Sequence, residues 1–358
     1  MRALICKVEQ KMELAVAEEL KEAGLEVEEF PGSFTDKDYD MEYIQALIDY
    51  MKSWEADMVW SMEYIPVISR ACLIRKIPYI AWSIGEMWNT LYSKTLQSPW
   101  NFVFIADEKI AEKFWKRNPG HIFYLSPGAR PDMPLEIPQA VGLCNSDIQY
   151  SVYYVKEECS EYMTGYIRGL IEAQQRVYGY HFLPNLMTKK RKAEFSKILS
   201  EPARGSDYYP KDIQTRIDDF LCDTITRNER EEAVKEMKEL GVFHEGDELS
   251  AVNVNVLSRK CRAGIPYDML RVMAAGGFVI TNYQDIIASS FAIGEEIVVY
   301  EDMKDLQEKV VYYLEHEEER REIAVKGKKR VEEKFSLKQR IEDIFYAVTE
   351  GLRSVEKG

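Results

Sequence analysis

Residues 253–266 read NVNVLSRKCRAGIP, and residues 267–284 continue as YDMLRVMAAGGFVITNYQ. The short apolar run at 251–257 predicts a buried strand, and a helical pattern over 267–275 begins directly after Pro266. A second strand is predicted at 277–282, directly after a Gly-Gly pair. A strand, a helix and a second strand in this order form one unit of a parallel sheet with a right-handed crossover. This stretch therefore predicts an α/β fold.

The loop between the first strand and the helix is basic and contains a glycine. Arg259, Lys260 and Arg262 precede a helix start, whose free N–H groups and partial positive charge suit an anion such as a diphosphate. In an open α/β sheet, ligands lie beyond the carboxyl ends of the strands, where this loop is expected. The alternative is that the cations are surface charges and that Gly264 only forms a turn. The loop alone does not decide between the two interpretations.

The residues before about 130 repeat the alternation of strands and helices, which predicts a parallel sheet covered on both faces. We expect strands at 2–8, 25–30, 57–62, 78–83, 101–107 and 121–125, with helical stretches near 12–20, 41–53, 66–76, 87–96 and 109–117. The second half opens with a predicted strand at 148–155, a helix at 161–178 and a charged helical tract to about 240. A strand at 296–300 and two charged helices follow the stretch quoted above.

A proline-rich stretch separates the two halves, with Pro127, Pro131, Pro134 and Pro138 close together. The length of 358 residues also favours two domains over one. We therefore predict a first Rossmann-like lobe at 1–130, a linker at 131–146, a second Rossmann-like lobe at 147–335 and a terminal helix at 336–358.

The composition excludes several classes of protein. Hydrophobic residues make up 46% and charged residues 30%, as in globular proteins. The net charge of −14 disfavours nucleic acid as a partner. No apolar run predicts a membrane span, and the N-terminus reaches a charge too soon for a signal peptide, so we expect a cytoplasmic protein. The six cysteines are widely spaced, which predicts free thiols and no structural metal site.

Several familiar motifs are missing or incomplete. Asp36-Lys37-Asp38-Tyr39-Asp40 resembles the start of a calcium loop, but Met41 and Leu47 stand where such a loop needs Gly and Glu. We expect this segment to be a solvated loop that caps the helix near Met41. The sequence has no Walker loop, no Gly-x-Gly-x-x-Gly after the first strand and no Gly-x-Ser-x-Gly, which disfavours P-loop kinases, nicotinamide dehydrogenases and the usual hydrolases.

From Asn253 to about Phe335 the chain resembles the C-terminal lobe of the CgeB-type (spore-protein, glycosyl-transferase-like) glycosyltransferases, a branch of the two-lobed GT-B group. Weaker matches extend the resemblance to both lobes. The matched features are Asn253-x-Asn255, Arg259, Gly264-Ile265-Pro266, Ala275-Gly276-Gly277-Phe278, Thr281-Asn282-Tyr283-Gln284, Phe291, Gly294-Glu295-Glu296, Tyr300, Tyr312-Tyr313-Leu314, Arg320-Arg321, and earlier Tyr166 to Gln174, Tyr178-Gly179-Tyr180, Ile77 to Trp82 and Asn101 to Ile105.

The resemblance implies a GT-B-like fold, with two Rossmann-like lobes facing a cleft and a last helix that crosses back to the first lobe. It implies a nucleotide-sugar donor on the C-terminal lobe, an acceptor facing the N-terminal lobe, and neither a cofactor nor an obligatory metal. Arg259, with Lys260 beside it, would contact the donor diphosphate. The turn from Gly264 to Tyr267 and the pair Gly276-Gly277 would shape the nucleotide site, and Asn282-Tyr283 would border the cleft.

The chain departs from the family pattern in four places. Asp268 and Arg271 exchange the signs of the family's usual pair, while their i,i+3 spacing still allows an ion pair. Ser151-Val152-Tyr153 stands where Val-Gly-Ser is common, Gly85-Glu86-Met87 replaces Asp-Ser-Pro, and the tract at 222–251 is short. These departures support an alternative function, in which a catalytically weakened subunit binds or stabilises an active glycosyltransferase.

A general base for an inverting transfer is expected near the acceptor. Glu86 is the first candidate because it follows a predicted strand at its carboxyl end. Glu9, Glu63 and His121 also stand at predicted strand ends and are weaker candidates. The acceptor is left open between a protein, a glycan and a small molecule, and a partner glycosyltransferase or a homo-oligomer are both compatible with the sequence.

Overall fold

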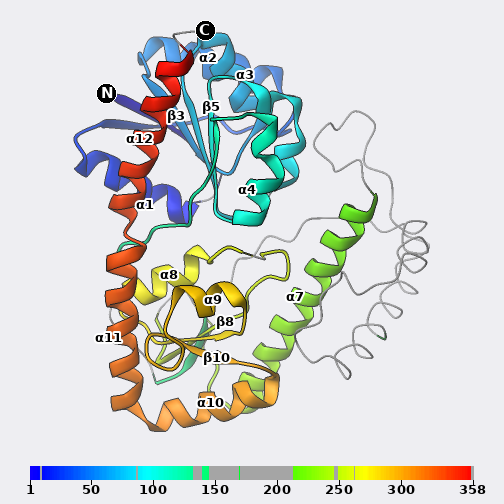
Figure 1. Cartoon of the computed structure of the whole chain (residues 1–358), viewed down its shortest axis with the longest axis vertical. Coiled ribbons are helices and arrows are strands. Elements are labelled where there is room, and N and C mark those ends of the chain that lie inside the picture. The colour runs from blue at the N-terminus through cyan, green and yellow to red at the C-terminus, as the bar shows by residue number, and fades with distance from the viewer. Residues whose placement is uncertain are drawn as a thin grey trace.

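The computed structural model describes residues 1–8, 10–85, 88–131, 139–144, 169, 213–245, 249–261 and 263–355. Figure 1 shows these residues as two α/β lobes, one above the other along the long axis of the molecule. Each lobe is built on its own parallel sheet. The two-lobed α/β architecture predicted from the sequence is confirmed.

The first lobe holds a six-stranded parallel sheet with the strand order β2-β1-β3-β4-β5-β6. Its strands are β1 (Arg2–Cys6), β2 (Glu26–Phe30), β3 (Met58–Met62), β4 (Tyr79–Ser83), β5 (Asn101–Ile105) and β6 (Ile122–Tyr124). Each corresponds to a predicted strand. The order reverses direction between β1 and β3, because the chain first builds outward to β2 and then continues on the other side of β1. Such a switch point is where ligands bind in open α/β sheets.

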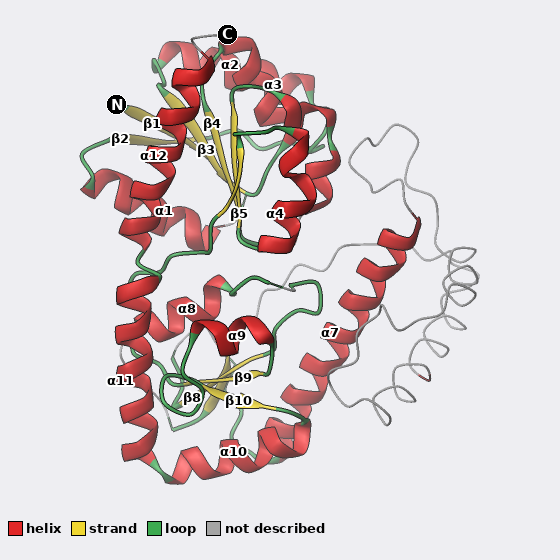
Figure 2. Cartoon of the chain, in the orientation of Figure 1, coloured by secondary structure: helices red, strands yellow, loops and turns green. Residues whose placement is uncertain are grey.

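Helices cover both faces of this sheet, and its central strands β3, β4 and β5 are therefore buried along their whole length. Alternate side chains of β1 enter different cores, with Ala3 and Ile5 on one face and Leu4 and Cys6 on the other. The first face packs against α1 (Gln10–Glu22) and α12 (Leu337–Val355), and the second against α2 (Met41–Ser53), α3 (Pro66–Arg75) and α4 (Glu108–Phe114). Figure 2 shows this arrangement of helices around the strands.

The second lobe contains, among the described residues, a four-stranded parallel sheet with the order β10-β9-β8-β7. The edge strand β7 lies within the stretch that the sequence predicts as the linker, and it pairs with β8. Its three residues were too few to give a periodic pattern beside Pro138. The strands are β7 (Val141–Leu143), β8 (Val252–Asn255), β9 (Val279–Asn282) and β10 (Val298–Tyr300).

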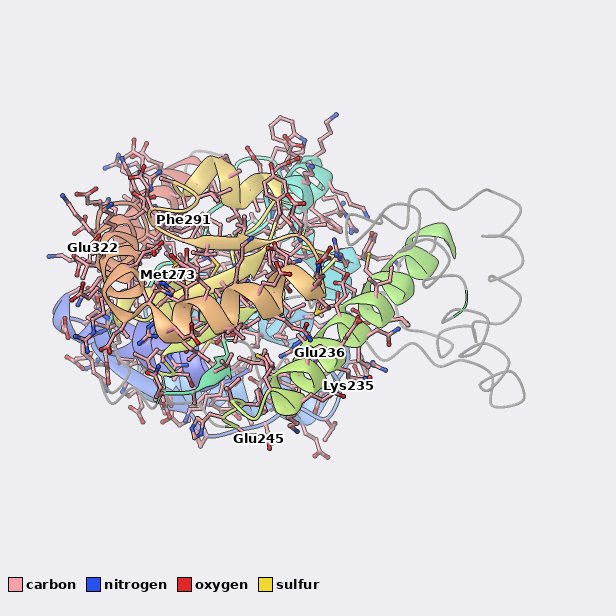
Figure 3. The ribbon with its side chains drawn as sticks, turned by 90° about the horizontal axis from the view of Figure 1, so that it is seen from below. Lys235, Glu236, Glu245, Met273, Phe291 and Glu322 are labelled. Atoms are coloured by element: carbon pink, nitrogen blue, oxygen red, sulfur yellow. The ribbon has the colours of Figure 1, made fainter. Side chains whose placement is uncertain are left out.

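The helices of the second lobe also lie on both faces of its sheet. The helices α8 (Tyr267–Ala274) and α9 (Asp285–Ser290) pack on one face, and α7 (Ile213–Glu239) and α10 (Met303–Glu315) on the other. Figure 3 views this lobe from below and shows Lys235 and Glu236 on α7 near α10, whose Gln307 donates to Glu236. The lobe is completed by α11 (Glu317–Lys334), which packs against α8 and α10.

The chain passes between the lobes at two places, and these two crossings pair with each other. The Ala129 N–H donates to the Phe335 carbonyl at 2.8 Å, and the Leu337 N–H donates to the Ala129 carbonyl at 3.2 Å. Arg340 donates to Ser126 Oγ at 3.0 Å and to the Lys334 carbonyl at 2.7 Å, so one side chain bonds to both crossings. The paired crossings thus form a single joint between the lobes.

The last helix returns to the first lobe, as predicted. In Figure 1, α12 runs alongside α1, and the two helices are in contact. The Phe345 ring of α12 lies edge-on to Trp60 of β3, with the centroids 6.1 Å apart. A Cβ at Gly351 would lie 2.3 Å from the Phe102 ring of β5, which shows how closely the helix approaches the sheet.

Some predictions differ from the structure or fall outside its described residues. The helix expected near 87–96 is two 3-10 helices, Trp88–Tyr92 and Lys94–Gln97. The strand at 148–155 and nearly all of the helix at 161–178 lie outside the described residues. The predicted helix cap is confirmed, because Asp40 Oδ1 accepts from the Tyr43 N–H at 2.9 Å. Among the described helices, none is both long and apolar enough to cross a membrane.

The packing of α12 predicts different effects for two substitutions on this helix. Ile344 is fully buried, whereas Tyr346 is 73% exposed. We expect Ile344→Ala to lower the free energy of unfolding by about 2–5 kcal/mol, because it leaves a cavity against the first lobe. Tyr346→Ala is the control and should change the free energy by less than about 0.5 kcal/mol. Urea denaturation measures both, and equal losses would contradict the docking of α12.

Candidate functional site

The candidate site lies where the strands of the second sheet end, at the loop between β8 and α8. This loop spans residues 256–266, of which all but residue 262 are described, and we call it the β8–α8 loop. It contacts the first lobe, because the Ala263 N–H donates to Asp107 Oδ2 at 2.9 Å. Since Asp107 follows β5, the carboxyl ends of the two sheets face each other.

Two asparagines hold the strand ends of the second sheet to this loop. Asn255 ends β8 and donates through Nδ2 to Thr281 Oγ1 at 2.9 Å. Asn282 ends β9, and its Oδ1 accepts from the Leu257 N–H at 2.7 Å. The Oδ1 of Asn255 and the Nδ2 of Asn282 are buried and have no hydrogen-bond partner among the described residues. Such atoms need a partner in a stable protein, so they are available to a ligand or to water.

The helix α8 begins directly after Pro266, at the end of the β8–α8 loop. Pro266 precedes the helix and makes no side-chain hydrogen bond to the first turn. Tyr267 is buried and Asp268 is half-buried at this end, with Arg271 half-buried one turn further along. Burial raises the pKa of the Cys144 thiol, and the charge of Asp268 raises it further, which places Asp268 beside the end of β7. Asp268 therefore lies at the carboxyl edge of the sheet, whereas Arg271 lies in the last turn of α8.

Arg259 and Lys260 form buried ion pairs with α7. Arg259 is 6% exposed, and its Nε and Nη2 donate to the two carboxylate oxygens of Glu229 at 3.0 and 2.5 Å. Lys260 is 5% exposed, and its Nζ lies 2.6 Å from Asp223 Oδ1. Burial raises the pKa of Glu229, against the opposing effect of the Arg259 charge. The predicted contact of these cations with a diphosphate stays a prediction, and in this structure their charges face carboxylates.

The partners of these cations form a row on one face of α7. Asp223, Thr226 and Glu229 are three residues apart, and Thr226 Oγ1 accepts from the Arg259 N–H at 2.9 Å. Residues at this spacing lie on the same side of a helix. The sequence interpretation missed Asp223 and Glu229, because their pairing with the two adjacent cations is distant in sequence. This row fixes the first half of the β8–α8 loop.

The three glycines predicted to shape the nucleotide site lie in different places. Gly264 lies in the loop at the lobe boundary, where a Cβ would be 3.0 Å from the Ala106 carbonyl oxygen. Gly276, with φ +89°, ends α8, and a Cβ at Gly277 would be 2.6 Å from Val272. Gly276 and Gly277 precede β9 and therefore lie at the opposite edge of the sheet from Asn282. The structure explains this pair by helix termination and packing.

The edge of the first sheet that faces this loop carries buried carboxylates. Glu63 follows β3 with a left-handed backbone (φ 72°), is 0% exposed, and accepts from the Gly85 N–H at 2.5 Å. Glu13 is also buried and accepts from the Val8 N–H after β1. These two carboxylates therefore bind the backbone at the switch point of the sheet. Glu86 and Glu9 lie outside the described residues.

His121 lies away from this edge. It precedes β6, and its Nδ1 is 3.0 Å from the carbonyl oxygen of Asn101, which begins β5. Burial lowers the pKa of His121. The weaker base candidate His121 is thus at the amino-terminal edge of the sheet, opposite the edge that carries Glu63. Within the described parts of the chain, no group of three or more His, Cys, Asp or Glu side chains is placed to hold a metal ion.

The part of the chain that carries this site matches a known family model. Residues 242–345 match the model for glycosyl transferase-like proteins. The matched residues include the β8–α8 loop, α8, β9 and α11, and they extend into α12. The narrower CgeB-type assignment remains a resemblance.

A curated relative matches over a shorter region. An uncharacterized protein of Aquifex aeolicus is 30% identical over 110 residues, which is 30% of this chain and 27% of that protein. The match therefore spans about a quarter of the length of the relative.

Solved structures similar to this chain include three from bacteria. A glycosyltransferase from Rickettsia africae has a TM-score of 0.48 and 11% identity, with 98% of each chain covered. Anabaena HepE, solved with UDP-glucose, has a TM-score of 0.49 and 10% identity, with 98% of this chain and 100% of that chain covered. Sucrose-phosphate synthase from Thermosynechococcus elongatus has a TM-score of 0.47 and 12% identity, with 99% and 98% covered.

Loss of the buried ion pair between Arg259 and Glu229 is expected to destabilise the fold. This effect must be separated from any effect on ligand binding. We expect Arg259→Met to lower the free energy of unfolding by about 3–5 kcal/mol, because Glu229 is left buried without its cation. The double variant Arg259→Met/Glu229→Met should recover most of this loss. Chemical denaturation of the single and double variants measures the coupling.

An exposed ion pair provides the matched control for this cycle. Arg321 pairs with Glu317 on the surface of α11, and both side chains are more than half exposed. Arg321→Met should cost less than about 1 kcal/mol. If Arg259→Met costs no more than Arg321→Met, the pair with Glu229 does not hold the loop.

Proposed function

We propose that the chain is a glycosyltransferase that moves a sugar from a nucleotide-sugar donor to an acceptor. The observation that carries the proposal is that the glycosyl transferase-like match at 242–345 contains the β8–α8 loop and α8. These are the elements whose geometry suits a diphosphate. The donor is a co-substrate, and the proposal needs no cofactor.

The donor diphosphate is proposed to bind at the start of α8. The N-terminus of a helix offers backbone N–H groups and a partial positive charge, and Pro266 contributes no competing side-chain cap. As the sugar leaves, negative charge grows on the diphosphate, and fixed dipoles of this kind stabilise it. Arg259 and Lys260 lie in the preceding loop, where their charges are shared with Glu229 and Asp223. We therefore assign the larger part of the stabilisation to the backbone of α8.

The nucleotide and the sugar are proposed to extend toward the ends of β8 and β9. Asn282 and Tyr283 lie there, and the buried Oδ1 of Asn255 can accept a hydrogen bond in addition. Asp268 lies beside this edge at the start of α8, and Arg271 lies further along the same helix. The amide and carboxylate oxygens of these residues can accept hydrogen bonds from hydroxyl groups of the donor.

The acceptor is proposed to bind at the facing edge of the first lobe, near its switch point. Glu86 remains the proposed general base, since it follows β4 at the carboxyl end of that strand. Glu63 already binds the Gly85 N–H in the buried interior, so it is better suited to supporting this edge than to taking a proton. The acceptor itself can be a protein, a glycan or a small molecule.

One observation favours a second function, that of a weakened subunit which supports an active partner. The carboxylates of α7 neutralise the two cations that the resemblance assigns to the donor diphosphate. A chain that no longer binds a nucleotide-sugar donor does not require unpaired cations in this loop. This alternative predicts feeble donor binding and an active glycosyltransferase that co-purifies with the chain.

Titration with nucleotides tests the proposed function. The full chain is titrated calorimetrically with UDP, GDP, CDP and dTDP, and the best binder is then offered as its common sugar conjugates. A nucleotide at a hundredfold excess over its dissociation constant should stabilise the fold by about 2.7 kcal/mol. Donor-dependent transfer or slow donor hydrolysis would support the enzyme. If no nucleotide binds, the enzymatic proposal fails and the partner function is favoured.

Tyr283 offers a variant that tests the location of the donor. We expect Tyr283→Ala to weaken nucleotide binding by about tenfold, because aromatic surface beside the ligand is lost. Tyr346→Ala, an exposed tyrosine on α12, is the control and should bind like the unchanged protein. Equal affinities in all three proteins would place the nucleotide elsewhere.

A further inference from the structure

The β8–α8 loop is bound by the first lobe as well as by its own. The Ala263 N–H donates to Asp107 Oδ2 at 2.9 Å, and the Glu108 N–H approaches the Ala263 carbonyl oxygen at 3.4 Å. Asp107 and Gly264 also form an antiparallel β-bridge. The chain after β5 therefore pairs with the loop like a short strand, across the boundary of the lobes.

The contact is close because residue 264 has no side chain. A Cβ at Gly264 would lie 2.9 Å from Cys261 Sγ and 3.0 Å from the carbonyl oxygen of Ala106. The second of these atoms belongs to the first lobe and is part of the backbone, which yields little. Gly264 is not in the left-handed region of φ, so a turn conformation alone does not require glycine here. The approach of the first lobe gives a physical reason for the glycine.

The carboxylate of Asp107 accepts one hydrogen bond from each lobe at this junction. Asp107 Oδ1 accepts from the Ile110 N–H at 3.0 Å and caps α4, while Oδ2 accepts from Ala263. Asp107 is 1% exposed, so both bonds are sheltered from water. Hydrogen bonds to a buried charged acceptor are stronger than neutral ones. The geometry of the loop is thereby tied to the start of a first-lobe helix.

We propose that Asp107 is a positioning residue for the donor site. It holds the second half of the β8–α8 loop, directly before α8, in the conformation that presents the start of that helix. Asp223, Thr226 and Glu229 hold the first half of the same loop from within the second lobe. The donor site is therefore shaped by both lobes. The identity of the bound ligand rests on the proposed function, whereas the role of Asp107 in holding the loop does not.

Hydrogen exchange of the unliganded protein tests the hold on the loop. In Asp107→Ser, the hydroxyl can still cap α4 but cannot also accept from Ala263. The Ala263 amide should then exchange about tenfold faster or more, because it loses a buried charge-assisted bond. Asp107→Asn has one acceptor oxygen and should give an intermediate rate. Unchanged exchange in Asp107→Ser would overturn the proposal.

A matched control separates the junction from helix capping. Asp302 caps α10 in the second lobe, where its Oδ1 accepts from the Asp305 N–H at 2.8 Å. Asp302→Ser should leave the exchange of Ala263 unchanged, and an equal effect of both serine variants would overturn the proposal. Gly264→Ala is an independent probe, since its methyl group must push the lobes apart. It should accelerate exchange of the same amide without altering any carboxylate.

Nucleotide titration then links the junction to the donor. The probe is whichever of UDP, GDP, CDP and dTDP binds the unchanged protein best. Its dissociation constant should rise about tenfold in Asp107→Ser and stay constant in Asp302→Ser. Equal affinity in Asp107→Ser and the unchanged protein, despite faster exchange, would overturn the positioning role. If none of the four binds the unchanged protein, the proposed function fails, and the exchange results alone decide whether Asp107 holds the loop.

Discussion

The relative placement of the two lobes depends on the paired crossings around Ala129 and Phe335. Their backbone bonds force the outgoing and the returning chain to pass through the same joint. A Cβ at Gly128 would lie 2.6 Å from the Cα of Leu337, so the two crossings are in close contact. With this joint at one side, the carboxyl ends of the two sheets meet, and Asp107 can reach Ala263. The contact of the β8–α8 loop with the first lobe depends on that geometry.

Two adjacent cations of the β8–α8 loop are balanced by carboxylates within the protein. Two cations on adjacent residues would attract any anion if they were exposed, but Arg259 and Lys260 are matched by two carboxylates on one face of α7. In the proposed donor site, oriented backbone dipoles would then supply attraction for an anion, and such dipoles act over a short range and require a fitted ligand. A site of this kind would discriminate by shape more than by charge, and would avoid the nonspecific binding of polyanions that an exposed basic loop permits.

Much of the fold was predictable because its signals are local. The central strands of the first sheet are largely apolar runs, as at Asn101–Ile105, and the helix after Pro266 begins at the expected residue. The edge strand β7 was not predicted because its three residues are too few to show a hydrophobic period. The site was less predictable, since it depends on contacts distant in sequence. Arg259 looked like an anion ligand because its partner Glu229 stands 30 residues earlier, and Gly264 looked like a turn former because Ala106 lies on another lobe.

The return of α12 to the first lobe has a consequence for the order of events during synthesis. Trp60 and Phe102 belong to strands in the first third of the chain, yet they pack against Phe345 and Gly351 at its far end. A ribosome adds about 5–20 residues per second, so more than 200 residues and roughly 10–40 s separate the last strand of the first sheet from its covering helix. During that interval the part of this apolar face that α12 covers is not yet packed, whereas α1 is already available to cover the neighbouring part.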